Sequence, residues 1–261
     1  MLVRTWNLFH GNTVPPQRAA FLDEMVDLAT ADDPDVLCLQ EVPAWALPRF
    51  TAGDVAARPL LGPLPSTAGV GRRLTAIHHG VLRSAFSGQG NAMHVSSRLR
   101  VLSHTRLTLN TRRFRDAQAR RLELGAAARL AWGSERRIVQ ALRLRGADAR
   151  TFLVANVHCT SYGADTRLAQ AELVRAAWFA TSAAQPEDVV VLAGDFNVTA
   201  ASPALHELTS EQWGFSAPGP GIDHVLVRGA ATSPPFRWPA ARRRRGGRLL
   251  SDHAPVEVQI T

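Results

Sequence analysis

The chain has 261 residues, enough for one large domain with a substantial core, and 46% of them are hydrophobic while 20% are charged. These proportions are ordinary for a soluble globular protein, and no apolar run approaches the length that a membrane span requires. The formal net charge of +8 favours anionic partners such as nucleic acid, phosphorylated small molecules or anionic lipid surfaces.

All 30 basic residues are arginines. Such complete replacement of lysine, beside so much alanine, indicates a genome-wide codon bias, so part of the arginine content is background. The absence of lysine excludes Schiff-base chemistry and a phosphate-loop lysine.

The two cysteines, Cys38 and Cys159, provide neither a zinc cluster nor a disulfide framework. Cys38 lies within an apolar run, which favours a buried free thiol. The first residues already predict a strand, so we expect no signal peptide. We therefore expect a reducing, cytoplasmic setting. Separately, we expect a monomer.

The first forty residues predict a strand, a helix and a second strand. The first strand is Leu2–Asn7, followed by a loop at Phe9–Asn12. Pro15 and Pro16 can begin a helix, since a missing N–H costs little there, and apolar residues recur at helical spacing as far as Ala29. Val36–Glu41 is the second strand, and this order predicts a layered α/β core.

The middle of the chain is less regular. Pro43–Arg73 is rich in proline, glycine and alanine and predicts a short helix followed by an irregular connection. Asn91–Ser97 and Leu99–Leu109 predict strands joined tightly around Ser97-Arg98. The arginine-rich Arg112–Arg129 is compatible with a helix or an exposed loop, and in both cases with a solvated charged face.

The second half predicts the remaining strands. Ile138–Leu144 and Thr151–Val157 alternate in polarity around a turn, which indicates an antiparallel hairpin ending at His158. Ala164–Ala184 has few helix breakers and predicts a helix. The apolar run from Val189 into Gly194 predicts a strand buried on both faces.

Two closing strands complete the expected fold, Ile222–Val227 and Val256–Ile260. The strands form antiparallel groups with helices between them, and we see no internal repeat or obvious linker. We therefore predict one α+β domain over 1–261, a four-layer α/β/β/α sandwich of two packed, mainly antiparallel sheets flanked by helices.

Polar residues collect at or just beyond these strands. Each has an ordinary structural explanation, such as a turn cap or a surface position at a strand end. Eight repetitions of the same pattern favour a functional site instead. The residues are Asn7, Glu41, His158, Asp195, Asn197, Asp223, Asp252 and His253.

The residue types in this set suit metal-assisted attack on phosphorus. The hard oxygens of Asn7, Glu41 and Asp252 suit Mg²⁺, with Mn²⁺ as a possible substitute. His158 and His253 can donate to phosphate oxygens or move protons near neutral pH.

Three further residues complete this chemistry. Asp223 is a candidate to orient His253 and raise its pKa. Asp195 and Asn197 follow a strand two residues apart, so they point the same way and are candidates to position the attacking water.

These residues lie in motifs that resemble the endonuclease/exonuclease/phosphatase superfamily, which has the DNase I-like fold. The motifs follow the family's order over nearly the whole chain. They are Thr5-Trp-Asn7, Leu39-Gln-Glu41, Gly90-Asn-Ala92 with Ser97-Arg98, Asn156-Val-His158, Gly194-Asp-Phe-Asn197, Ile222-Asp-His-Val225 and Ser251-Asp-His-Ala-Pro255.

The resemblance implies Glu41 as the principal Mg²⁺ ligand, assisted by Asn7 and Asp252. It implies Asp195 and Asn197 around the nucleophilic water and the scissile phosphate.

The resemblance also implies that His253, paired with Asp223, and His158 stabilise charge or shuttle protons. Accounts of the family differ on which residue is the general base.

Departures from the family pattern bear on the substrate. Abasic-site nucleases carry a tyrosine in a Tyr-Ser-Gly type motif, whereas the one tyrosine here is Tyr162, just after His158. The Trp-Cys-Asp-Arg element of phosphoinositide 5-phosphatases is also absent. The catalytic core is therefore present without a signature of any one subfamily.

Candidate substrate contacts come from the remaining motifs and from an arginine run near the C-terminus. Arginines 242 to 245, with Trp238 before them, could grip a nucleic-acid backbone or stack a base, or could form a solvated, codon-biased turn. The candidates are Asn91, Arg98, Trp238, Arg242, Arg243, Arg244 and Arg245.

The sequence thus predicts a Mg²⁺-dependent phosphodiesterase or nuclease acting on DNA or RNA. An alternative is a phosphatase or phospholipase-like hydrolase of a small phosphorylated molecule or lipid head group. A third is a non-catalytic basic module that binds nucleic acid, which the intact set of carboxylates and histidines disfavours.

Overall fold

The computed structural model describes residues 1–17, 19–57 and 88–261. The N-terminal apolar runs form the centre of the first sheet. β1 (Leu2–Asn7) and β3 (Val36–Pro43) pair in parallel, because α1 (Leu22–Thr30) carries the chain back between them.

Four more strands complete this six-stranded sheet, in the order β11-β14-β1-β3-β5-β4. β14 (Val256–Gln259) and β5 (Gln89–Val95) flank the central pair, both antiparallel to their neighbours. β4 (Ala52–Ala57) and the short β11 (Phe236–Arg237) form the two edges.

The second sheet has five strands in the order β10-β9-β8-β7-β6. The antiparallel hairpin of β7 (Ile138–Arg145) and β8 (Thr151–His158) lies at its centre, as predicted. α6 (Arg167–Ala183) connects β8 to the parallel β9 (Val189–Asp195). The remaining two strands are β6 (Arg100–Thr108) and β10 (Asp223–Arg228).

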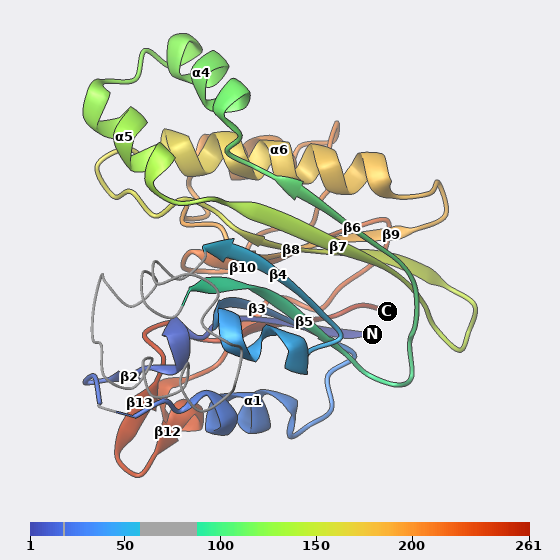
Figure 1. Cartoon of the computed structure of the whole chain (residues 1–261). Helices are drawn as coiled ribbons and strands as arrows, with labels where there is room; N and C mark the ends of the chain where they lie inside the picture. The colour runs from blue at the N-terminus through green and yellow to red at the C-terminus, as the bar shows by residue number, and fades with distance from the viewer. Residues whose placement is uncertain (18, 58–87) are drawn as a thin grey trace.

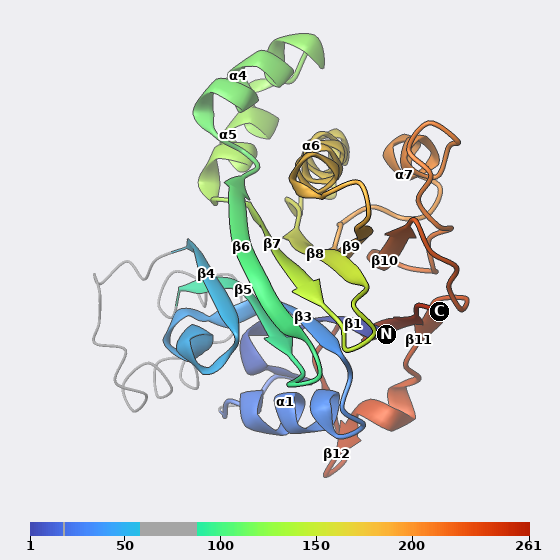
Figure 2. The ribbon, with the colours of Figure 1, turned by 90° about the vertical axis from the view of Figure 1, so that its right-hand side faces the viewer.

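The two sheets pack face to face with helices outside, which confirms the predicted four-layer sandwich (Figures 1 and 2). α1 covers the outer face of the first sheet, while α6 and α7 (Pro203–Leu208) cover that of the second. α4 (Arg112–Arg121) and α5 (Ala126–Ser134) project beyond α6.

Alternating side chains along the strands build the core. In β3, Cys38 faces the other sheet while Leu37 and Leu39 pack against α1. In β9, Val191 joins the space between the sheets and Leu192 packs under α6, so this strand is buried on both faces as expected.

Short elements fill the connections. A third sheet joins β12 (Arg244–Arg245), β13 (Arg248–Leu250) and β2 (Thr13–Val14). Three 3₁₀ helices lie elsewhere in the described chain. They are η1 (Phe9–Gly11), η2 (Ala44–Arg49) and η3 (Ala240–Arg243).

Some local predictions were wrong. The first helix begins at Leu22 and not at Pro15 or Pro16, because Thr13–Val14 is extended and paired with β13. The strand β4 was not predicted within Pro43–Arg73, although the short helix at Ala44–Arg49 was. The rest of that expected connection, from residue 58 on, lies outside the described residues.

Two open questions from the sequence are answered by the fold. The arginine-rich segment after residue 111 forms the helices α4 and α5. The tight connection at Ser97-Arg98 joins strands of different sheets, since β5 belongs to the first sheet and β6 to the second. Among the helices in the described part of the chain, none is long and apolar enough to cross a bilayer.

Candidate active site

The predicted polar residues meet where strands of both sheets end at the same edge of the sandwich. Asn7 ends β1, and Glu41 follows Gln40 within β3. His158 ends β8 and is in register with Asp195, the last residue of β9. The Nδ2 atom of Asn7 donates to Oδ2 of Asp195 at 3.0 Å, which connects the two sheets.

Just beneath the site, buried side-chain amides form hydrogen bonds between the two sheets and hold their strand ends together. Gln40 Nε2 donates to Oδ1 of Asn156 at 2.7 Å across the interface. Asn156 in turn donates to the backbone oxygens of Leu39 and Ala92 in the first sheet. All of these hydrogen bonds are buried, so they fix the relative register of the strand ends.

Gly194 is required for the close approach of β9 to β8. Its φ is +148°, and a Cβ atom there would lie 1.9 Å from the backbone oxygen of Val157. Any side chain would push the strands apart, and glycine alone adopts this conformation without strain. The glycine therefore places Asp195 beside His158.

Asp195 is almost completely buried, with 2% of its surface exposed. Its Oδ1 accepts the backbone N–H of Asn197 at 3.0 Å, while Oδ2 faces the site. Burial, together with the charge of Asp223, raises the pKa of Asp195 to about 7 against the opposing effects of His253 and Asn7. The carboxylate is thus held by hydrogen bonds in a desolvated position.

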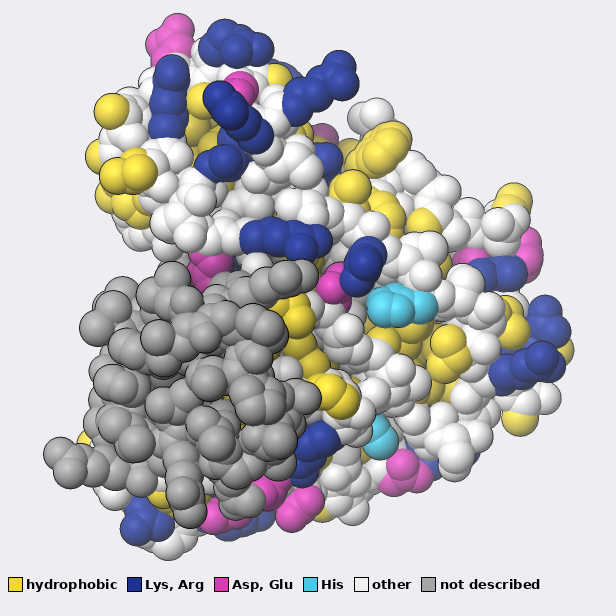
Figure 3. Space-filling view, in the orientation of Figure 1, with side chains coloured by type: hydrophobic (Ala, Val, Ile, Leu, Met, Phe, Trp, Pro, Cys, Tyr) yellow, Lys and Arg dark blue, Asp and Glu magenta, His cyan; other side chains and the backbone are white. Residues whose placement is uncertain are grey.

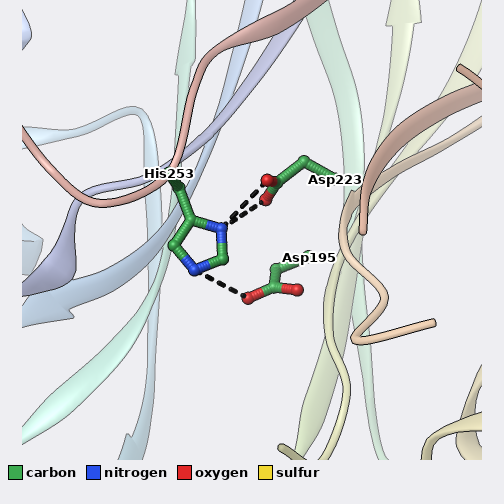
Figure 4. Close-up of side chains that lie close together, drawn as sticks. All are labelled: Asp195, Asp223 and His253. Carbon is green, nitrogen blue, oxygen red and sulfur yellow. Dashed lines mark hydrogen bonds and ion pairs between the residues drawn. The ribbon is translucent and has the colours of Figure 1, made fainter. Parts of the chain in front are cut away.

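His253 lies between two carboxylates (Figure 4). Its Nδ1 lies 2.9 Å from Oδ2 and 3.0 Å from Oδ1 of Asp223, and its Nε2 points toward Oδ2 of Asp195 at 3.8 Å. Burial opposes protonation, but the hydrogen bond to Asp223 and the surrounding carboxylates raise the pKa of His253 to about 10. His253 is therefore a cation with an N–H on each ring nitrogen, of which Nδ1–H is bonded to Asp223 and Nε2–H remains for a ligand.

The loop that carries His253 is tied to β1. Trp6 Nε1 donates to the backbone oxygen of His253 at 3.0 Å. Ser251 Oγ donates to the backbone oxygen of Asn7 at 2.7 Å and accepts the N–H of His253 at 3.0 Å. These contacts explain why the Ser-Asp-His segment reaches the site from a connection between strands.

His158 has a partner that the sequence analysis missed. Arg137, which is 7% exposed, places Nη1 3.1 Å from Nε2 and 3.2 Å from Nδ1 of His158. Glu135 accepts from the other end of the guanidinium at 2.6 Å. Burial and then the charge of Arg137 hold the pKa of His158 well below its usual range, so His158 is neutral.

Glu41 is aimed into the site by an irregularity in β3. The pairing of β3 with β5 shifts register between Leu39 and Val42, and Glu41 adopts a positive φ of 51°. Asn7 Nδ2 donates to Oε1 at 3.2 Å, and His10 Nε2 lies 3.2 Å from Oε2. His10 is a second residue that the sequence analysis left as loop.

Asp252 and Asn197 lie at the periphery of this cluster. Asp252 is exposed, and desolvation with the nearby charge of Glu41 raises its pKa although His253 opposes the shift. Asn197 has a positive φ of 52°, and its Nδ2 donates to the backbone oxygen of Cys159 at 2.9 Å. The structure thus brings all eight predicted strand-end residues to one region.

Two predicted substrate contacts are wrong. Arg98 donates to Asp33 and Asp35 at the start of β3, separated from Glu41 by the length of that strand, roughly 20 Å. Asn91 is 1% exposed, and its amide donates to the backbone oxygen of Ile138 at 3.3 Å between the sheets.

Trp238 is buried and is therefore also excluded as a surface for base stacking. It is 2% exposed, donates to Glu257 at 2.9 Å, and has Arg4 and Arg242 over its ring at 4.4 and 3.5 Å. Arg242 pairs in addition with Asp32 at 3.0 Å. These contacts fasten the C-terminal loop to β14 and to the turn after α1, so the prediction for Trp238 and Arg242 was wrong.

Arg243 is an internal residue that supports the site. It is 5% exposed, and its Nη1 donates to the backbone oxygens of Leu250, Ser251 and His253 at 3.1, 3.1 and 2.6 Å. It therefore positions the His253 loop and is not free to bind substrate. Only Arg244 and Arg245 of the run are exposed, and their predicted substrate contact stays a prediction.

Replacing Arg243 with methionine should lower the free energy of unfolding by about 2–4 kcal/mol, because three carbonyl oxygens lose a charged donor. Chemical denaturation measures this effect. The matched control is Arg244→Met in the exposed neighbour, which should stay within about 0.5 kcal/mol of the wild type. Equal stability of the two variants would contradict the assigned role.

The amino-acid sequence matches the model of a known family. Residues 5–253 match the sequence model described as the Endonuclease/Exonuclease/phosphatase family. The chain belongs to this family. The resemblance inferred from the motifs is thereby confirmed, and since endonuclease/exonuclease/phosphatase enzymes hydrolyse phosphoesters, this protein is a phosphoester hydrolase. No curated protein sequence matches the chain.

Solved structures of the endonuclease/exonuclease/phosphatase fold are similar over the whole chain. The human Nocturnin catalytic domain with bound sulfate has a TM-score of 0.63 at 16% identity and is covered over 93% of its length. D. rerio TDP2 with a single-strand DNA product has a TM-score of 0.60 at 13% identity, with 98% covered. The mannosyl-6-phosphatase of Bacteroides thetaiotaomicron has a TM-score of 0.55 at 14% identity, with 99% covered. Each match spans 100% of this chain and, at such identity, shows the fold alone.

Proposed function

We propose that this protein is a Mg²⁺-dependent phosphodiesterase that cleaves nucleic acid by attack of water on phosphorus. The observation that carries the proposal is the convergence of Asp195, the His253–Asp223 pair and the carboxylate of Glu41 at one edge of the sandwich. One bound phosphate could then be reached by a group that activates water, a group that stabilises charge and a group that binds a cation.

The residues present fit a divalent cation. Glu41 and Asp252 are close enough that the charge of Glu41 acts on Asp252, a repulsion that a bound cation would relieve. Asn7 places its Nδ2 toward Glu41 and Asp195. Within the described residues, its Oδ1 accepts only the N–H of Phe9. Asn7 would join the ligands by turning its amide so that the oxygen faces Glu41. Three hard oxygens suit Mg²⁺, with Mn²⁺ as a substitute.

A second group of candidate ligands, Asp195, Asp223 and His253, has donor atoms within 4.8 Å of one another. Both ring nitrogens of His253 already face carboxylates, which favours a proton-holding and charge-stabilising role for this group over a metal site. We therefore assign the cation to Glu41, Asp252 and Asn7.

The protein side chains divide the reaction between them. Asp195 accepts a hydrogen bond from the water and takes its proton as the new O–P bond forms. The ester oxygen leaves with the electron pair of the broken P–O bond. A cation bound at Glu41 would supply positive charge to the phosphate and the leaving oxygen.

The neighbouring residues hold the phosphate and the water in place. His253, oriented by Asp223, donates its Nε2–H to a phosphate oxygen, since this nitrogen faces the same space as Asp195. Within the described part of the chain, Oδ1 of Asn197 accepts no hydrogen bond, which leaves it for the water. Neutral His158 supplies one further hydrogen bond.

A nucleic-acid substrate is supported by the net charge of +8, because a polyanion is attracted to such a surface. The D. rerio TDP2 structure of the same fold holds a single-strand DNA product. The B. thetaiotaomicron mannosyl-6-phosphatase shares that fold too, so a small phosphoester is the alternative substrate.

A substrate panel tests the proposal. We expect hydrolysis of single- or double-stranded oligonucleotides in Mg²⁺ or Mn²⁺, and none in EDTA. Preference for a sugar phosphate over all oligonucleotides would replace the nuclease with a phosphatase. Oligonucleotide binding without turnover of any phosphoester would indicate a non-catalytic module. Undiminished hydrolysis in EDTA would contradict the metal assignment.

A further inference from the structure

A trough of about 490 Å³ lies on the helical layer outside the second sheet, between α4, α6 and α7. Its volume falls in the range of ligand-binding clefts, about 300–1,000 Å³. The lining includes Phe114 and Arg121 of α4, Trp178 of α6, and Trp213, which follows α7. No part of the mechanism above uses this surface.

All three walls of the trough begin at the active-site edge. The α4–α5 arm, residues 111–137, ends in Arg137, which contacts His158. α6 follows His158, and α7 follows Asn197, in chain order. Asn110 fastens the base of the arm by donating to the backbone oxygens of Trp132 and Glu135 at 3.0 and 2.6 Å. The three walls therefore link the trough to the edge of the sandwich that holds the active site, although none of the site residues lines the trough itself.

The α4–α5 arm concentrates positive charge. It contains eight arginines and three carboxylates, which leaves +5 of the chain's +8 on these residues. Figure 3 shows dark blue side chains gathered over this part of the molecule. Codon bias explains arginine in place of lysine, but it does not explain why the charge is concentrated here.

Three exposed arginines of α4 lack a counter-charge. Elsewhere, exposed Arg98 and Arg167 form ion pairs with nearby carboxylates. In the described chain, no carboxylate lies within ion-pair distance of Arg113, Arg120 or Arg121. Only Arg121 of the three lines the trough itself. Arg113 and Arg120 share the adjacent face of α4, about 100° around the helix from Phe114 and Arg121, where they form the rim. This row complements a chain of phosphates.

Trp178 supplies an aromatic surface beside that charge. It is 62% exposed and lines the trough together with other apolar side chains, such as Val174 of α6. Phe114 is less available, since Arg175 lies 4.3 Å over its ring and Trp132 packs against its edge. Basic grooves that combine arginines with an exposed aromatic side chain are typical of single-strand binding, in which bases stack on the ring.

We propose that the trough binds a single-stranded segment of the nucleic-acid substrate, with Arg113, Arg120 and Arg121 on phosphates and Trp178 stacked on a base. This inference rests on the proposed function. It adds that the substrate is single-stranded and that part of it lies in the trough. An unpaired strand is required because a base within a duplex cannot offer its face to Trp178.

The arginine contacts are tested by R113Q/R120Q/R121Q in a D195N background, with anisotropy of a fluorescein-labelled single-stranded oligonucleotide as the readout. The Kd should rise at least about tenfold, and the slope of log K against log salt should fall by about 2, near 0.7 per lost phosphate contact. The matched control is R100Q/R145Q/R228Q, which removes the same charge from exposed arginines at the opposite ends of the strands. Equal weakening by both triples would overturn the inference.

The stacking contact is tested by Trp178→Ala. Binding of a normal strand should weaken at least about fivefold, whereas a strand of abasic nucleotides should bind both proteins equally. An equal loss with both strands would overturn the stacking. If W178A instead converted a wild-type dimer to a monomer in light scattering, the trough would be an interface between copies and the inference would be wrong.

Hydrolysis separates this inference from the proposed function. With Asp195 intact, R113Q/R120Q/R121Q should raise the KM for a single-stranded oligonucleotide and leave hydrolysis of bis(p-nitrophenyl) phosphate unchanged. If the wild type cleaves the oligonucleotide and the triple variant matches it, only the trough assignment fails. If the wild type cleaves no oligonucleotide, the proposed function fails.

Discussion

Replacing Asp195 with asparagine should lower kcat for phosphodiester hydrolysis by about 10²–10⁴-fold, the usual contribution of a positioned proton acceptor. The amide has the same shape but cannot take a proton from water. Its oxygen can still accept the N–H of Asn197, which Asp195 accepts at 3.0 Å, so the fold should survive. Steady-state hydrolysis of bis(p-nitrophenyl) phosphate and an oligonucleotide measures the effect.

Asp148→Asn is the matched control for this substitution. Asp148 is exposed in the turn between β7 and β8, and its Oδ1 accepts the N–H of Arg150, which an amide oxygen can also do. It should retain wild-type activity. An Asp195→Asn enzyme with more than half of the wild-type kcat and an unchanged melting temperature would exclude Asp195 as the residue that acts on water.

Glu41→Gln should raise the Mg²⁺ concentration for half-maximal activity at least about tenfold. Loss of even an outer partner of a metal ligand costs about 10–100-fold in affinity, and removal of the principal ligand should cost no less. The amide can still accept from Asn7 Nδ2, which now lies 3.2 Å from Oε1, so the neighbouring side chains should stay in place.

A direct measurement separates binding from catalysis in this variant. Titration of Mn²⁺ followed by electron paramagnetic resonance should show weaker binding by Glu41→Gln than by wild type. Glu211→Gln, in an exposed residue after α7, is the control and should bind Mn²⁺ normally. Wild-type Mn²⁺ affinity in Glu41→Gln would refute the assignment of the cation to this carboxylate.

The local patterns predicted the strands well, because the apolar residues in each run are the ones that its own strand buries. The run into Gly194 indicated a doubly buried strand, and Val191 and Leu192 indeed pack on its opposite faces. The polar residues that follow such strands were also found, since strands from two stacked sheets end at one edge. This is why Asp195 and His158 meet in register.

Residues whose role depends on a distant partner were missed. Arg137 precedes an ordinary strand, and its contact with His158 arises only when β7 pairs with β8. His10 reaches Glu41 because η1 folds back over β3. Nothing in the local spacing of either residue indicates these contacts.

Other residues were wrongly predicted to contact substrate because they are close to site motifs in the sequence. Arg98 follows the strand that holds Asn91, but an antiparallel strand carries it to the far end of the sheet, where it pairs with Asp35. Trp238 and Arg243 resembled an exposed basic lip, yet both are buried against partners from other elements.

The sequence by itself determined which chemical groups leave the strand ends and to which family the chain belongs, because motifs such as Gly194-Asp-Phe-Asn197 are local and their order follows the chain. Only the tertiary structure decided which arginines are internal supports and which remain for a ligand. An arginine is buried when carbonyls or carboxylates from distant segments satisfy its donors, as at Arg243. It stays available where no described residue does so, as at Arg121 of the arm.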